Sequence, residues 1–165
     1  MLFLYNERYK KHILLPSKYN VLGDVYMVQN ALKLANTNPH VIAYISGKNE
    51  SSKIKGTVEF FEWTGGSIVK LEITGLPKML NNFLKFSIQD ICECEKANIL
   101  KTTNNCIDDL PMIYSNNGYA YMLYYTSKFT PKEVVGRFAL IQEIEGSTYE
   151  IIGGGKILKR RWMFI

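Results

Sequence analysis

The chain has 165 residues, enough for one domain with a real apolar core. Its net charge of +5 comes from sixteen lysines and four arginines that are spread along the sequence apart from the triplet at 159–161, so we expect no nucleic-acid partner. No window approaches the ~18 consecutive apolar residues of a membrane span, and the N-terminus lacks a signal-peptide pattern. Three cysteines, an odd number, fit a reducing compartment. We therefore expect a cytoplasmic protein without a membrane partner.

Residues 1–38 form an N-terminal extension that differs from the rest of the chain. Its second half carries apolar residues at helical spacing behind a candidate N-cap, Asp24. These apolar residues are Val21, Val25, Val28, Leu32 and Ala35. The spacing predicts a short amphipathic helix, which the run Asn36-Thr37-Asn38-Pro39 would end.

From residue 39 to residue 158, short apolar or alternating segments are separated by Gly, Asn and Pro, which is typical of an all-β domain. The predicted strands are 41–46, 54–60, 69–73, 83–90, 112–114, 119–125, 134–144 and 149–158. Eight antiparallel strands favour a Greek-key sandwich or barrel. Residues 91–109 are expected to form a polar loop that holds all three cysteines, and residues 159–165 a basic and aromatic tail.

Glycine-containing turns set the expected strand boundaries. Thr64-Gly65-Gly66 joins two alternating segments into a hairpin. Asn116-Asn117-Gly118 predicts a tight turn, because Asn-Gly supplies the positive φ angles that such a turn requires. Gly153-Gly154-Gly155 predicts a bend or a close backbone approach within the last strand.

Six segments of this β region, in order, resemble the bacterial copper/zinc superoxide dismutase family. They are Asn38–Gly47, Ile54–Phe61, Ile73–Pro77, Phe86–Asp90, Leu110–Ala120 and Val134–Ile141. The likeness covers roughly residues 38–157. It implies an eight-stranded Greek-key β-barrel over residues 39–158.

The resemblance also implies that the metal ligands are lost. The family holds copper with four histidines and zinc with three histidines and an aspartate, one histidine being shared, whereas this chain has two histidines in total. Ser87, Gln89 and Gln142 correspond to copper histidines. Cys106 and Asp109 correspond to a zinc histidine and the zinc aspartate, so only Asp109 keeps its identity. We expect neither copper nor zinc as a cofactor.

Two supporting features of the family are missing as well. Its intrasubunit disulfide would join Cys94 to the position of Gly154, which has no sulfur. The loop whose charge steers superoxide toward copper is shortened here to about residues 145–149. The resemblance thus implies that the electric field that speeds superoxide capture is missing. The resemblance therefore predicts a non-catalytic structural or binding protein. Residual dismutase activity, with His12 or His40 borrowed from a neighbouring copy, is the less favoured alternative.

The cysteines leave a different function open. Cys92 and Cys94 would face the same side of an extended segment, and Cys106 and Asp109 could complete a site for zinc or cuprous copper. The spacing matches no common zinc pattern. The other readings are a disulfide from Cys106 to Cys92 or Cys94 under oxidation, or unpaired structural thiols.

The remaining candidates are polar and aromatic. Ser87, Gln89 and Gln142 either bind a small polar ligand or hydrogen-bond one another, and we favour the second because an uncompensated buried polar group is costly. His12 and His40 are expected to be surface or packing residues. Five tyrosines on one hairpin and the tail Trp162–Ile165 could form a homodimer or partner surface, or ordinary core. The tyrosines are Tyr114, Tyr119, Tyr121, Tyr124 and Tyr125.

Overall fold

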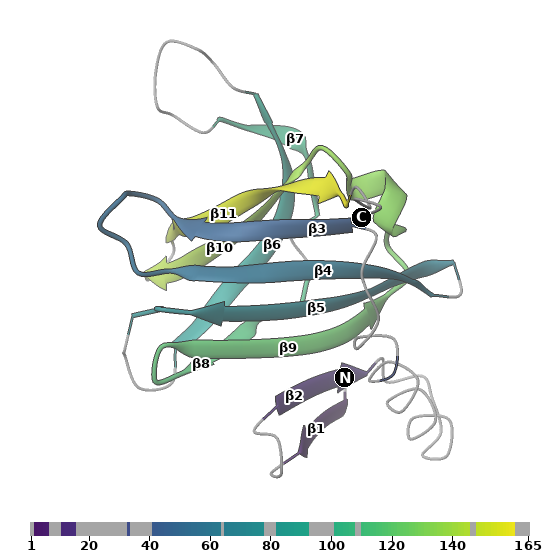
Figure 1. Cartoon of the computed structure of the whole chain (residues 1–165), viewed down its shortest axis with the longest axis horizontal. Coiled ribbons are helices and arrows are strands. Elements are labelled where there is room, and N and C mark those ends of the chain that lie inside the picture. Colours follow the sequence, from purple (N-terminus) through teal and green to yellow (C-terminus); the bar gives the residue numbers. More distant parts are fainter. Residues whose placement is uncertain are drawn as a thin grey trace, which may run out of the picture.

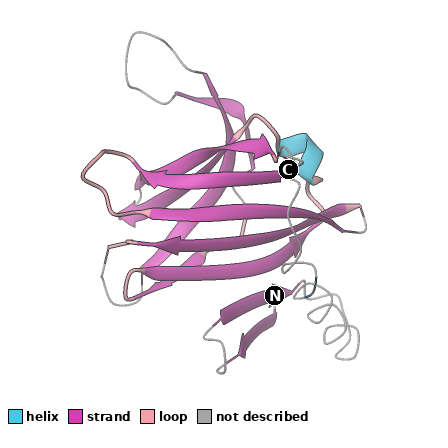
Figure 2. Ribbon diagram, viewed as in Figure 1, coloured by secondary structure: helices cyan, strands magenta, loops and turns pink. Residues whose placement is uncertain are grey.

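Eight strands form a closed antiparallel β-barrel in the computed structural model (Figures 1 and 2). The structure describes residues 2–6, 11–15, 33, 41–63, 65–77, 82–92, 101–107, 110–145 and 148–160. The barrel strands are β3 (Val41–Gly47), β4 (Lys55–Trp63), β5 (Gly66–Thr74), β6 (Asn82–Cys92), β8 (Ile113–Asn116), β9 (Tyr119–Thr126), β10 (Phe138–Glu145) and β11 (Thr148–Lys159). The predicted all-β class and the eight-stranded barrel are confirmed.

The order of neighbours around the barrel is β3, β4, β5, β9, β8, β6, β10, β11 and back to β3. Every one of these pairs is antiparallel. The short strand β8 closes the ring, because it pairs with β6 on one side and with β9 on the other. Closure leaves none of these strands with a fully open edge.

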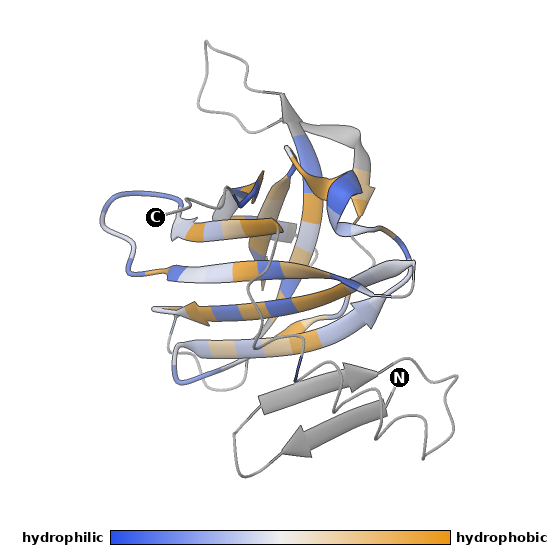
Figure 3. Cartoon of the chain, turned by 45° about the vertical axis from the view of Figure 1, so that its right-hand side comes forward, coloured by the Kyte–Doolittle hydropathy of each residue, from blue (hydrophilic) through white to orange (hydrophobic). Residues whose placement is uncertain are grey.

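Strand alternation fills the interior. Along β6, Phe86 and Ile88 point into the barrel and are fully buried, and Val58 and Phe60 of β4 do the same. The rings of Phe60 and Phe129 meet edge to face with centroids 6.2 Å apart. Each such side chain contributes about 1.5–3 kcal/mol by leaving water. Figure 3 shows the resulting alternation of hydrophobic and hydrophilic residues along the strands.

The predicted tight turn is confirmed. Asn117 and Gly118 have φ angles of 54° and 79° and join β8 directly to β9. Both angles lie in the left-handed region, which Asn and Gly enter at the lowest cost. Gly65, with φ 74°, likewise lies in the turn between β4 and β5.

The three consecutive glycines of β11 let neighbouring backbones approach closely, as the sequence predicts. A β-carbon on Gly155 would lie 2.0 Å from the carbonyl oxygen of Tyr44 in β3. The pairing of β10 with β11 also shifts register at this point, since Ile141 faces Gly153 whereas Gln142 faces Ile151. Such a bulge adds one residue to one strand and bends it.

Two sequence-based boundaries are wrong. Residues 91–109 are not simply a loop, because β6 continues to Cys92 and β7 (Lys101–Ile107) pairs antiparallel with it. The run Lys-Thr-Thr-Asn-Asn-Cys-Ile has no apolar alternation, so its strand rests on backbone pairing that periodicity does not reveal.

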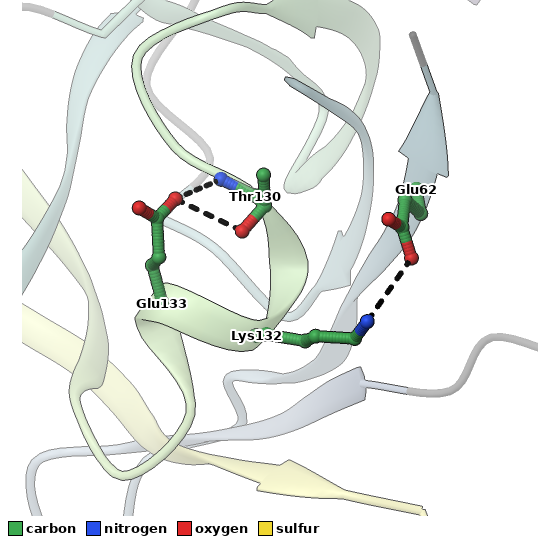
Figure 4. A network of polar contacts seen from close by, with 4 residues as sticks. All are labelled: Glu62, Thr130, Lys132 and Glu133. Atoms are coloured by element: carbon green, nitrogen blue, oxygen red, sulfur yellow. Dashed lines mark hydrogen bonds and ion pairs between the residues drawn. The ribbon is translucent and has the colours of Figure 1, made fainter. Parts of the chain in front are cut away.

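The strand predicted from Val134 begins instead at Phe138, because a 3₁₀ turn, η1 (Pro131–Val134), precedes it. The Glu133 carboxylate accepts hydrogen bonds from the backbone N–H and the hydroxyl of Thr130 at the start of this turn (Figure 4). These hydrogen bonds hold the pKa of Glu133 below its ordinary value. Lys132 lies 3.9 Å from Glu62 of β4.

The N-terminal extension contributes two strands that the sequence does not predict. β1 (Leu2–Asn6) and β2 (Lys11–Leu15) form a hairpin, and β2 pairs in parallel with β9 from Met122 to Tyr124. β8 pairs only with Tyr119 and Ala120, so β2 covers the part of the β9 edge that β8 does not reach. The predicted helix over residues 21–35 lies outside the described residues apart from Lys33. Within the described residues, no helix is long and apolar enough to cross a membrane.

Replacing Gly155 with alanine tests the close approach of β11 to β3. The added methyl group meets the Tyr44 carbonyl, so we expect Gly155→Ala to lower the free energy of unfolding by about 1–3 kcal/mol in urea denaturation. Ser46→Ala, an exposed change on β3, serves as the control and leaves the midpoint almost unchanged. Equal stability of Gly155→Ala and the parent chain would contradict this packing.

Candidate functional site

Ser87, Gln89 and Gln142 lie together and hydrogen-bond one another. The Ser87 hydroxyl donates to Oε1 of Gln142 over 3.1 Å and accepts from Nε2 of Gln89 over 3.0 Å. All three side chains are buried, with 0%, 4% and 8% of their surface exposed for Ser87, Gln89 and Gln142. We call this group the polar cluster.

The pairing of β6 with β10 positions the polar cluster. Ser87 faces Leu140 across the two strands, and Gln142 lies two residues further along β10, in the diagonal position on the same face. Gln89 lies two residues from Ser87 along β6, so strand alternation puts it on that face too. Because Phe86 and Ile88 fill the interior, the cluster occupies the outer wall of the barrel.

The polar cluster leaves one acceptor unused. The single hydroxyl proton of Ser87 goes to Gln142, and its oxygen receives the amide of Gln89. Oε1 of Gln89 has no hydrogen-bond partner in the described part of the chain. A buried polar atom without a partner costs about 1–3 kcal/mol, so the Gln89 side chain is incompletely satisfied where it lies.

These side chains do not suit copper or zinc. The donors are one hydroxyl and two neutral carboxamides, which already bond to one another, whereas both metals favour imidazole or thiolate. Among the described residues, no group of three His, Cys, Asp or Glu side chains is placed to hold a metal ion. The donor set therefore fits neither metal of the superoxide dismutase family.

Charged side chains flank the polar cluster along β6. Asp90 lies 3.3 Å from Arg137, and the ammonium group of Lys85 sits 4.3 Å from the centre of the Tyr149 ring. Both interactions join β6 to segments that follow it late in the sequence. They lie to either side of the cluster along β6 and place no charge within it.

Cys106 adjoins the polar cluster from β7. It pairs directly with Gln89, and its side chain is half-buried. Cys92 pairs instead with Lys101, three residues further along β6, or about 10 Å at the usual strand rise. That separation exceeds the ~7 Å between α-carbons that a disulfide allows, so this register does not support a bridge from Cys92 to Cys106.

Several predicted site residues lie outside the described residues. These are Cys94, Asp109, His40, Arg161 and the tail residues 162–165, while the side chains of Cys92 and His12 are likewise not described. The backbone of His12 belongs to β2 and pairs with Met122.

The tyrosine-rich hairpin is largely part of the protein interior. Tyr124 points into the barrel core and Tyr121 belongs to a second apolar cluster, so neither offers a free surface. Tyr119 donates a hydrogen bond to Glu72 over 3.1 Å. Burial, followed by the negative charge of Glu72, raises the pKa of Tyr119 and of Tyr121 to about 12. These phenols are therefore neutral near pH 7. An interface through the partly exposed Tyr114 and Tyr125 stays a prediction.

Comparison with protein-family models and with curated proteins finds no match to this chain.

Two buried serines allow a matched test of the polar cluster. Ser87→Ala leaves Gln142 and Gln89 each without a partner, so we expect it to lower the free energy of unfolding by about 1–3 kcal/mol. Ser115 of β8 is buried to the same degree, but its hydroxyl has no partner in the described part of the chain. Ser115→Ala should therefore be neutral or stabilising. Equal losses for both variants in chemical denaturation would show that the cluster adds no stability.

Proposed function

We propose that this chain is a non-catalytic relative of copper/zinc superoxide dismutase, whose barrel serves as a structural or binding protein. The order of strands supports the family's Greek-key topology. Numbered along the chain, the barrel strands neighbour one another in the order first, second, third, sixth, fifth, fourth, seventh, eighth. Two connections, from β5 to β6 and from β9 to β10, therefore pass over strands that they do not pair with, as in a Greek key.

The polar cluster carries the proposal. Ser87, Gln89 and Gln142 correspond, by the sequence resemblance, to three copper histidines, and these three residues meet on one patch although 55 residues separate Ser87 from Gln142. A hydrogen-bonded set joins β6 to β10 where the family would use a metal. The stabilising interaction is thus retained in another chemical form, and the redox centre is not.

The connection between β10 and β11 supports the same conclusion. Glu145 pairs with Thr148, so only two residues lie between the strands. In the family this connection carries the loop that steers superoxide toward copper. Two residues are too few for such a loop. We therefore expect this chain to lack both the electron-transfer metal and the field that attracts superoxide.

Supplying the metals tests the proposal. We expect the purified full chain, incubated with copper and zinc and then desalted, to remove superoxide no faster than buffer. An authentic copper/zinc superoxide dismutase treated in the same way is the positive control. We also expect the melting temperature to be the same with and without the metals, because a metal that binds only the folded chain would raise it. Metal-dependent superoxide removal would overturn the proposal.

A further inference from the structure

The described outer wall of the barrel has two covered areas and a strip that is bare at Tyr44 and Leu158. Beside β6 and β10, the outward side chains of Ser87, Leu140 and Gln142 are buried. Over β4, β5 and β9, the outward side chains form the second apolar cluster, which is also buried. Its members are Phe61, Ile68, Tyr121 and Leu123. Along β3 and β11, in contrast, Tyr44 is 61% and Leu158 46% exposed, although Ile42, on the same side of β3 as Tyr44, is only 5% exposed.

The bare strip runs along two adjacent strands (Figure 1). Gly154 pairs with Ser46 and Ile157 with Ala43, which places Lys156 beside Tyr44, while Leu158 pairs with Ile42.

Val135 extends the strip. The N–H of Gly136 donates to the carbonyl of Ile157, so Val135, which is 40% exposed, lies at the Leu158 end. Five large apolar side chains are strongly exposed in the described part of the chain, and Tyr44, Val135 and Leu158 are three of them. All three lie on or next to β3 and β11, and a group of exposed apolar side chains is typical of an interaction surface.

The strip is bordered by positive charge. Lys156, Lys159 and Arg160 are all exposed, and Lys55 of β4 pairs with Ser46 at the other end. Glu59 lies opposite Ile42 on β4, but its carboxylate is 2.7 Å from Lys70, so its negative charge is already paired.

An open hollow of about 430 Å³ adjoins the Ser46 end of the strip. Its charged lining residues are Lys48, Glu50 and Lys55. Lys48 also pairs with Glu150 at 3.1 Å, whereas Lys55 lies opposite Ser46, its pairing partner on β3. The hollow is open to solvent and could receive a side chain of a partner.

We propose that this strip binds an acidic segment of another polypeptide. Apolar side chains of the partner pack on Tyr44, Leu158 and Val135, and its carboxylates pair with Lys156, Arg160 and Lys55. Charge complementarity selects this occupant. This inference rests on the binding part of the proposed function and deepens it by naming the chemistry of the partner.

Other occupants fit the strip less well. A second copy in a symmetric contact would bring like surfaces together, so that Lys156 and Arg160 of one chain would approach the same cations of the other. A nucleic acid calls for a broad basic face, whereas the cations of this chain are spread along its sequence.

Selection from a random peptide library tests the proposal. The full chain is immobilised, a phage library of random twelve-residue peptides is selected on it, and the enriched peptides are synthesised for fluorescence anisotropy. We expect enriched sequences to combine Asp or Glu with apolar residues. We expect Tyr44→Ala and Arg160→Glu each to weaken their binding at least ~10-fold.

Two exposed residues elsewhere provide matched controls. Tyr149→Ala removes a tyrosine that is 51% exposed beside Lys85, and Lys128→Glu reverses an exposed lysine after β9. Both should bind the selected peptides within about 2-fold of the parent chain. All four replaced residues are exposed, so we expect each variant to keep the melting temperature of the parent chain. That result would show that the four variants fold.

Four outcomes would overturn the inference. The first two are a library that yields no acidic peptides, and selected peptides that bind Tyr44→Ala and Arg160→Glu as tightly as the parent chain. The third is a dimer in sedimentation velocity that Tyr44→Ala dissociates. The fourth is binding to vesicles of phosphatidylcholine and phosphatidylserine that depends on Tyr44. None of these readouts involves copper or zinc. Failure of the peptide test and failure of the metal test are therefore distinguishable.

Discussion

The Ser87 hydroxyl lies between two glutamine side chains, and its hydrogen bonds join two distant parts of this chain. Through Gln142 it connects β6 to β10, and through Gln89 it reaches the part of β6 that pairs with β7. A single hydroxyl can donate once and accept from another group, so its geometry fixes the orientation of both carboxamides. The outer wall of the barrel is thereby held by hydrogen bonds at the place where the proposed relatives use metal ligands.

Closure of the barrel depends on one short strand. β8 has only four residues, and it joins β6 and β9 at one end of these strands. Further along, β7 pairs with β6 and β2 pairs with β9, so strands outside the barrel cover the edges that β8 leaves. The polar cluster and the second apolar cluster are buried parts of the outer surface, whereas Tyr44 and Leu158 on β3 and β11 are exposed.

Sequence patterns predicted the barrel because most of its strands alternate and end at Gly or Asn turns, as at Asn117-Gly118. They also put Ser87 and Gln89 on one face, but the approach of Gln142 followed only from the family resemblance, since periodicity does not say which strands pair. The sequence patterns did not predict β7, because its polar run lacks alternation. They did not predict β2, because its parallel pairing with β9 leaves no local signal in the sequence. The exposure of Tyr44 depends on which outer faces other segments cover, and that is a property of the whole fold.

A double-mutant cycle between Ser87 and Gln142 tests the central claim most directly. The free energies of unfolding of the parent chain, Ser87→Ala, Gln142→Met and the double variant give the coupling between the two side chains, free of their separate effects. A direct hydrogen bond between β6 and β10 predicts a favourable coupling of about 1 kcal/mol. A coupling of zero would mean that the cluster does not join the strands and would contradict its role in place of a metal.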